Sequence, residues 1–268
     1  MKKIAILPTL LTLGNGVCGF SAIAVASMID ADPGYLVVSA WLVIAAMIFD
    51  VFDGYVARLS RTASEFGGQL DSLCDAVSFG AAPAFILWKG FGGLYEAPVM
   101  RQTVAVVAVL YMVCAILRLA RFNVENTPDP AGHKRFKGLP SPVAAGCVVS
   151  LAILRGQMPT TLTGLEPALK VFTQLWAPVG ALLVAMLMVS RVPFPHLTKQ
   201  LLRGRRHFSY LVRIVLVVAL IALMRELAVA VVFWGYTLGL LVNHGIARAL
   251  HHDTEPAPAA GLDDAVPH

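Results

Sequence analysis

The sequence predicts an all-α fold, a polytopic bundle of membrane-spanning helices. Hydrophobic residues make up 57% of the 268 positions and charged residues only 14%, whereas a soluble domain carries roughly a quarter charged residues. The apolar residues also fall into long runs, and a helix needs a run of about 20 such residues to cross a bilayer. We therefore expect lipid to surround most of the chain.

About eight segments are predicted to span the membrane, at residues 10–28, 35–52, 70–88, 103–119, 140–154, 169–189, 212–224 and 227–250. Only Arg225 and Glu226 separate the last two segments, so the count falls if this polar break is buried. Residues 1–252 are predicted to form the transmembrane domain. Residues 253–268 mix Pro, Ala and Asp without apolar periodicity, which predicts a disordered cytoplasmic tail.

The positive charges lie between the apolar segments. If the N-terminus is cytoplasmic and the loops alternate, 16 of the 21 Lys and Arg residues fall on the cytoplasmic side. This asymmetry follows the positive-inside rule and predicts that both termini are cytoplasmic. Because the cations are divided among loops and form no single patch, the net charge of +5 does not indicate a nucleic-acid partner.

Four aspartates lie within or at the ends of predicted spans, where a carboxylate costs roughly 2.5–3.5 kcal/mol to insert. Asp50 and Asp53 share one face of the second predicted helix, and Asp71 and Asp75 lie four positions apart on the third. Two antiparallel helices with a short connection bring all four together at one end. Oxygen ligands without His or Cys favour hard cations such as Mg²⁺, Mn²⁺ or Ca²⁺, and four carboxylates balance two divalent ions.

Small residues predict a groove beside these carboxylates. Gly54 and Ala57 lie on the same helix face as Asp50 and Asp53, and their size leaves room for a nucleotide or pyrophosphate. Arg58 follows at the mouth, where it can bind a phosphate or hold a carboxylate. Small residues at this spacing also pack membrane helices together. Intramembrane carboxylates also occur in cation transporters, but here they lie at one end of two helices and no inverted repeat is visible.

The residues form a string that resembles the signature of the CDP-alcohol phosphatidyltransferases, and it reads Asp50-x2-Asp53-Gly54-x2-Ala57-Arg58-x8-Gly67-x3-Asp71-x3-Asp75. The resemblance implies that the four aspartates bind divalent metal, Mg²⁺ or Mn²⁺, and that Asp75 is also the catalytic base. It further implies that the CDP and phosphate groups are bound by the following residues: Gly54, Ala57, Arg58, Gly67, Thr12 and Asn15.

Four further segments, at residues 7–15, 78–84, 118–124 and 136–142, look like the bacterial and archaeal phosphatidylserine synthase branch of this family. The resemblance implies transfer of a phosphatidyl group from CDP-diacylglycerol to the hydroxyl of L-serine, with release of CMP. It also implies a homodimer in the inner (cytoplasmic) membrane of a prokaryote, with the active site facing the cytoplasm. This branch commonly has Asn where the chain has Thr9, and often Arg where it has Tyr55.

A serine carboxylate needs a cation, and its ammonium or hydroxyl group needs a polar partner. The candidate serine contacts on the cytoplasmic side are Arg118, Arg121, Asn123, Lys137 and Ser141. The cations among them could equally be topology signals or contacts to lipid phosphate. Family members that act on phosphorylated alcohols, the phosphatidylglycerophosphate and phosphatidylinositol phosphate synthases, need cations here as well. They therefore remain alternatives.

Overall fold

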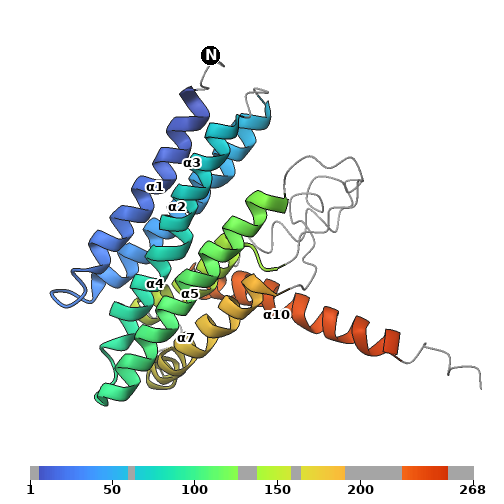
Figure 1. Ribbon diagram of the computed structural model, residues 1–268. Coiled ribbons are helices and arrows are strands. Elements are labelled where there is room, and N and C mark those ends of the chain that lie inside the picture. The colour runs from blue at the N-terminus through green and yellow to red at the C-terminus, as the bar shows by residue number, and fades with distance from the viewer. Residues whose placement is uncertain (1–5, 60–63, 126–137, 158–163, 191–224, 253–268) are drawn as a thin grey trace, which may run out of the picture.

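The computed structural model describes residues 6–59, 64–125, 138–157, 164–190 and 225–252, and within these ranges every regular element is a helix (Figure 1). In chain order the helices are α1 (Ile6–Ala26), α2 (Gly34–Leu59), α3 (Glu65–Asp75), η1 (Ala76–Ala81), α4 (Ala82–Leu87), η2 (Trp88–Gly92), α5 (Pro98–Glu125), α6 (Ser141–Gly156), α7 (Glu166–Val189) and α10 (Arg225–His252). The predicted all-α class is confirmed.

Five helical segments are long and apolar enough to cross a membrane, and they are Ile6–Ala26, Gly34–Ala57, Glu65–Gly92, Pro98–Val124 and Glu166–Val189. Two further apolar helices, Ser141–Gly156 and Leu227–Val242, are shorter. The chain is therefore an integral membrane protein built as a helix bundle. These seven helices match seven predicted spans, whereas the predicted span 212–224 and the predicted tail 253–268 lie outside the described residues. Eight spans and two cytoplasmic termini stay predictions.

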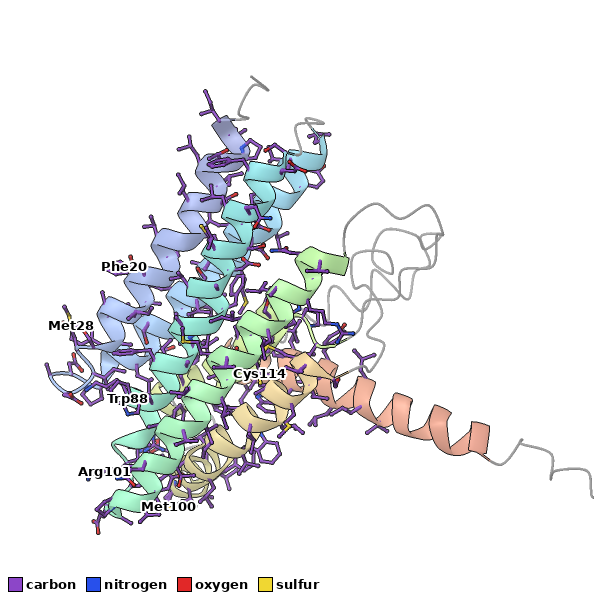
Figure 2. The ribbon with its side chains drawn as sticks, viewed as in Figure 1. Phe20, Met28, Trp88, Met100, Arg101 and Cys114 are labelled. Atoms are coloured by element: carbon purple, nitrogen blue, oxygen red, sulfur yellow. The ribbon has the colours of Figure 1, made fainter. Side chains whose placement is uncertain are left out.

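Large apolar side chains point outward from the bundle, as expected where lipid is the solvent. Phe20 on α1 and Met28 in the turn after it are 67% and 51% exposed, and both carry labels at the edge of the molecule in Figure 2. The interior is rich in small residues, with Ala22, Ala40 and Ala144 all fully buried. Small residues let helix backbones approach closely, which is how membrane helices pack without a hydrophobic driving force between them.

The helix ends differ from the predicted spans for local reasons. Helix α1 is already helical at Ile6, the first described residue, four residues before the predicted span. Pro8 is compatible with this, because near the start of a helix its missing N–H removes no helical hydrogen bond. Helix α3 begins at Glu65, because the Ser64 side chain caps it and accepts a hydrogen bond of 3.0 Å from the backbone N–H of Gly67. The site residues on both sides of the α2–α3 connection are therefore helical.

The third span is not a uniform α-helix. Two π-helical segments, η1 and η2, interrupt it, and η1 begins directly after Asp75. A π-helical turn changes the direction of side chains and carbonyl groups, and such turns are frequent at functional sites. The buried hydroxyl of Tyr111 on α5 donates a hydrogen bond of 3.0 Å to the carbonyl of Phe79 in η1. This contact ties the irregular segment to α5.

Candidate metal centre and active site

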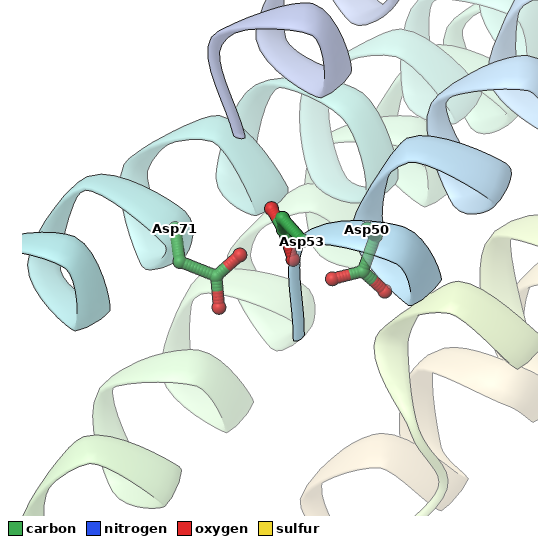
Figure 3. Close-up of side chains that lie close together, drawn as sticks. All are labelled: Asp50, Asp53 and Asp71. Atoms are coloured by element: carbon green, nitrogen blue, oxygen red, sulfur yellow. The ribbon is translucent and has the colours of Figure 1, made fainter. Parts of the chain in front are cut away.

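Three of the predicted metal ligands converge between α2 and α3. One carboxylate oxygen from each of Asp50, Asp53 and Asp71 lies within 4.8 Å of the other two. Figure 3 shows Asp53 between its two neighbours, with the carboxylates of Asp50 and Asp71 directed toward it. The arrangement arises because Asp50 and Asp53 are less than one turn apart on α2, and Asp71 lies on α3, close beyond the connection between the two helices.

A cavity of about 190 Å³ opens beside this cluster, between α1, α2 and α3. Its lining residues are Pro8, Thr9, Thr12, Asp53, Gly54, Ala57, Ser64, Gly67, Gly68 and Asp71. Four residues predicted to contact CDP are therefore brought together here: Thr12, Gly54, Ala57 and Gly67. Of the other two, Arg58 has its backbone in α2 but its side chain lies outside the described residues, and Asn15 is absent from the described lining.

Glycines keep one wall of this cavity open. A Cβ atom added at Gly68 would have no other atom within 4 Å, and one at Gly67 would meet only Oγ of Ser64, at 3.2 Å. Helix α3 therefore exposes backbone in its first turns, at the positive end of the helix dipole. Such an end favours negatively charged groups, so the cavity can accept the phosphates of a nucleotide.

The donor set and its environment fit a divalent cation. Oδ1 of Asp71 is buried and has no hydrogen-bond partner among the described residues, and Asp53 is only 5% exposed. Three carboxylates this close repel one another unless a positive charge lies among them. Carboxylate oxygens are the ligands that Mg²⁺, Mn²⁺ and Ca²⁺ prefer.

Asp75 lies beside this cluster, one turn further along α3 than Asp71. It is 7% exposed, and its charge interacts with those of Asp50 and Asp71. Oδ1 of Asp75 accepts a hydrogen bond of 2.9 Å from Nδ2 of Asn15 on α1. Asp75 is not one of the three residues whose oxygens all lie within 4.8 Å, so its role as a fourth metal ligand stays a prediction.

Arg118 on α5 is a cation whose charge acts on two of these carboxylates. Its guanidinium interacts electrostatically with Asp75 and Asp50, although no carboxylate among the described residues pairs with it within 4.0 Å. Nη1 donates a hydrogen bond of 2.8 Å to Oγ of Ser141, and the guanidinium lies 5.3 Å from the ring centroid of Phe122. Two predicted serine contacts, Arg118 and Ser141, thus touch each other.

A left-handed glycine places Ser141 at this position. Gly138 has a φ of 93°, a conformation that residues with a side chain rarely adopt. A Cβ atom here would overlap the carbonyl oxygen of Met188 at the end of α7. The next residue, Leu139, donates a backbone hydrogen bond of 3.0 Å to the carbonyl of Leu187. The segment before α6 is therefore fastened to α7, and Ser141 begins α6 opposite Arg118.

The other predicted serine contacts are placed differently. The Asn123 amide exchanges hydrogen bonds of 2.9 and 3.0 Å with the hydroxyl of Ser72 on α3, next to Asp71. Arg121 is half-buried on α5, and Lys137 lies outside the described residues. The partner Ser72 was not predicted from the sequence, because a serine in an apolar helix carries no signal of its own.

Comparison with known proteins agrees with this geometry. Residues 5–191 match the CDP-alcohol phosphatidyltransferase family, and the chain belongs to that family. Its members generally use divalent metal ions, consistent with the aspartate cluster.

Several proteins similar to this chain are named as enzymes that make serine-containing lipids. The CDP-diacylglycerol–serine O-phosphatidyltransferase of Bacillus subtilis is 30% identical over 193 residues, which is 72% of this chain and 92% of that protein. An enzyme of the same name from Helicobacter pylori is 31% identical over 251 residues, which is 93% of each chain. The archaetidylserine synthase of Methanothermobacter thermautotrophicus is 35% identical over 192 residues, which is 70% of this chain and 69% of that protein.

Proposed function

We propose that this protein is a phosphatidylserine synthase, which transfers the phosphatidyl group of CDP-diacylglycerol to the hydroxyl of L-serine and releases CMP. One observation carries the proposal: three aspartates converge beside a cavity of about 190 Å³ within helices that face lipid. Such a site can take a substrate that is a nucleotide at one end and a lipid at the other. The choice of serine is supported by the names of the relatives.

The donor binds with its CDP group in the cavity, against Gly54, Ala57 and Gly67, and with its acyl chains in the surrounding lipid. Thr12 also lines this cavity, and Arg58 is a further proposed contact. Asn15, the remaining residue predicted to contact CDP, is absent from the described lining of this cavity. Divalent ions, Mg²⁺ or Mn²⁺ and two in number, would be held by Asp50, Asp53, Asp71 and Asp75. When bound, these ions neutralise the charge of the pyrophosphate and of the departing CMP.

The acceptor enters from the side of Arg118, which has no carboxylate partner within 4.0 Å in the described structure and can bind the serine carboxylate. Arg121, Asn123, Lys137 and Ser141 are further contacts of this acceptor. Asp75 accepts the proton as the serine O–H bond breaks, and the serine oxygen bonds to the phosphorus that carries diacylglycerol. The bond from this phosphorus to CMP breaks, and Asp75 then passes its proton to solvent.

The reaction takes place at the cytoplasmic face of a prokaryotic inner membrane, since both substrates are expected there and the positive-inside rule puts the α2–α3 connection on that side. We also propose that the protein works as a homodimer, which rests on the resemblance to the family. A relative is named archaetidylserine synthase, so a donor with diether chains is worth assaying beside CDP-diacylglycerol.

The test is incorporation of labelled serine into extractable lipid by the purified protein in detergent. With CDP-diacylglycerol and Mn²⁺ or Mg²⁺, we expect lipid-linked serine and an equal amount of CMP. EDTA should stop both, and either metal should restore them. Activity that resists chelation would contradict the metal site. Binding of Mn²⁺ without CMP release from CDP-diacylglycerol, whichever acceptor is offered, would instead favour a cation-binding protein such as a transporter.

A further inference from the structure

The side chain of Asn15 contacts the carboxylate that the proposed mechanism uses as its base. Asn15 is completely buried, and Nδ2 donates its hydrogen bond of 2.9 Å to Oδ1 of Asp75. The two residues are 60 positions apart, so this bond joins α1 to α3. Asn15 is absent from the described lining of the CDP cavity, although Thr12, one turn earlier, belongs to it. Asn15 therefore has a different role from Thr12.

The backbone of α1 packs closely against the third span at and just after Asn15. A Cβ atom at Gly16 would lie 2.9 Å from Sγ of Cys74, and one at Gly19 would lie 2.6 Å from Cα of Ser78. Ser78 also donates a hydrogen bond of 2.9 Å to the carbonyl oxygen of Asn15. The residues before and after Asp75 along its helix thus hold the segment of α1 that carries the amide. Asn15 and Asp75 have little freedom to move apart.

A packing role does not account for an asparagine at this position. An amide buried in a membrane helix is costly unless its groups are bonded. Oδ1 of Asn15 is nevertheless buried and has no hydrogen-bond partner among the described residues. Alanine fills equivalent buried positions further along α1, at Ala22 and Ala26. The bond that explains the asparagine is the one from Nδ2 to Asp75.

We propose that Asn15 is a positioning residue for Asp75, and this inference rests on the proposed function. By holding Oδ1, the amide fixes the rotation of the carboxylate and leaves Oδ2 to take the proton of the acceptor hydroxyl. A base works when it is held within hydrogen-bond reach of the proton it removes. Asn15 is absent from the described lining of the CDP cavity, and it acts through its bond to Asp75.

The test compares Asn15→Ala with Ser39→Ala, using whichever acceptor alcohol the wild-type protein accepts. Ser39 is a matched control, because it is also fully buried and makes one hydrogen bond, to the carbonyl of Leu36. We expect Asn15→Ala to lower kcat about 10- to 100-fold, the usual effect of removing a residue that orients a ligand or base. The KM for each substrate and the affinity for CDP-diacylglycerol, measured by calorimetry, should change less than about twofold, because only the base has moved. Ser39→Ala should leave kcat, the KM values and the affinity for CDP-diacylglycerol near those of the wild-type protein.

A loss of CDP-diacylglycerol affinity with an unchanged kcat would overturn the inference and make Asn15 a nucleotide contact instead. A wild-type kcat would overturn it as well. If Asn15→Ala does not fold, Ser78→Ala provides the second measurement, since it loosens the same segment of α1 and should lower kcat in the same direction with the substrate affinities retained. An unchanged kcat in Ser78→Ala would then contradict the inference that this segment of α1 positions Asp75. Wild-type protein that releases no CMP with any acceptor contradicts the proposed function, which is a separate outcome.

Discussion

Asp53 and Asp75 are 5% and 7% exposed within helices that face lipid. Burying an ionised carboxylate is expensive unless an opposite charge lies close to it. Arg118 interacts with Asp50 and Asp75, but one guanidinium cannot balance four carboxylates. The residues therefore fit a site completed by divalent cations.

The role of Asp75 can be tested by Asp75→Asn. Removing a general base typically costs 10²- to 10⁴-fold in rate, so we expect turnover to fall at least about 100-fold. The amide is nearly the same size, and the cavity does not include Asp75, so CDP-diacylglycerol should still bind. Parallel measurements of CMP release and of lipid binding check this. Wild-type turnover in the variant would remove Asp75 from the mechanism.

Arg118→Ala tests the acceptor contact. A hydrogen bond to a charged group contributes about 1.5–3 kcal/mol, so we expect the KM for serine to rise roughly 10- to 100-fold. The KM for CDP-diacylglycerol should change little, because Arg118 is absent from the described lining of the CDP cavity. Arg101→Ala is the matched control, since Arg101 is exposed at the other end of α5 and donates to the carbonyl of Tyr95. Equal effects of both variants would show that the change acts through α5 and not through the acceptor.

At the residue scale, the spacing of the aspartates predicted that four of them meet, because helical periodicity fixes which side chains share a face. The structure brings the oxygens of three of them within 4.8 Å of one another. The partners that hold the site were less accessible. The bond from Asn15 to Asp75 crosses 60 positions, and no local pattern specifies which helices become neighbours. The pairing of Asn123 with Ser72 was missed for the same reason.

At the scale of elements, α1 has a larger role than its apolar sequence indicated. It packs against α2, α3 and η1, and it contributes to the cavity wall. Long apolar runs predicted the helices because run length and hydropathy determine membrane insertion. The π-helical segment η1 was not predicted, since its residues carry the same hydropathy as an α-helical turn.

The turn before α6 gives a prediction at this scale. Gly138→Ala should destabilise the protein by about 1–3 kcal/mol, the usual cost of a strained backbone position, because φ is 93° and Met188 blocks a Cβ atom. Serine KM should rise too, as Ser141 moves away from Arg118. Thermal unfolding in detergent and serine titration measure the two effects.

Gly164→Ala is the control for this variant, because a Cβ atom at Gly164 would meet nothing within 4 Å. It should leave both stability and KM near the wild-type values. If Gly138→Ala matches this control, the turn does not position α6.

At the scale of the whole molecule, the bundle places the aspartate cluster near the connection between α2 and α3. In Figure 1 this end also holds the start of α1, while α10 extends away from the other helices. The first part of α10 is fastened to α6, where Trp234 donates a hydrogen bond of 3.0 Å to the carbonyl of Cys147. The site is thus built by the N-terminal helices together with α5 and the start of α6.

The predicted topology can be tested with reporter fusions. If the chain has eight spans and both termini are cytoplasmic, a reporter that is active only in the cytoplasm should be active when it is fused after residue 252. The same reporter inserted in the 60–63 connection should also be active. Arg58 lies just before that connection and Arg61 within it, as the positive-inside rule expects. A periplasmic C-terminal reporter would indicate an odd number of spans and would show that segments 212–224 and 227–250 do not form a hairpin.

The central claim, that serine is the acceptor, is tested most directly by an acceptor screen. Purified protein is incubated with CDP-diacylglycerol and Mn²⁺, and CMP release is followed with serine, glycerol 3-phosphate, inositol and inositol phosphate. We predict CMP release with serine and none above background with the other three. Release with a phosphorylated alcohol in place of serine would leave the aspartate site intact but would contradict the assignment as a phosphatidylserine synthase.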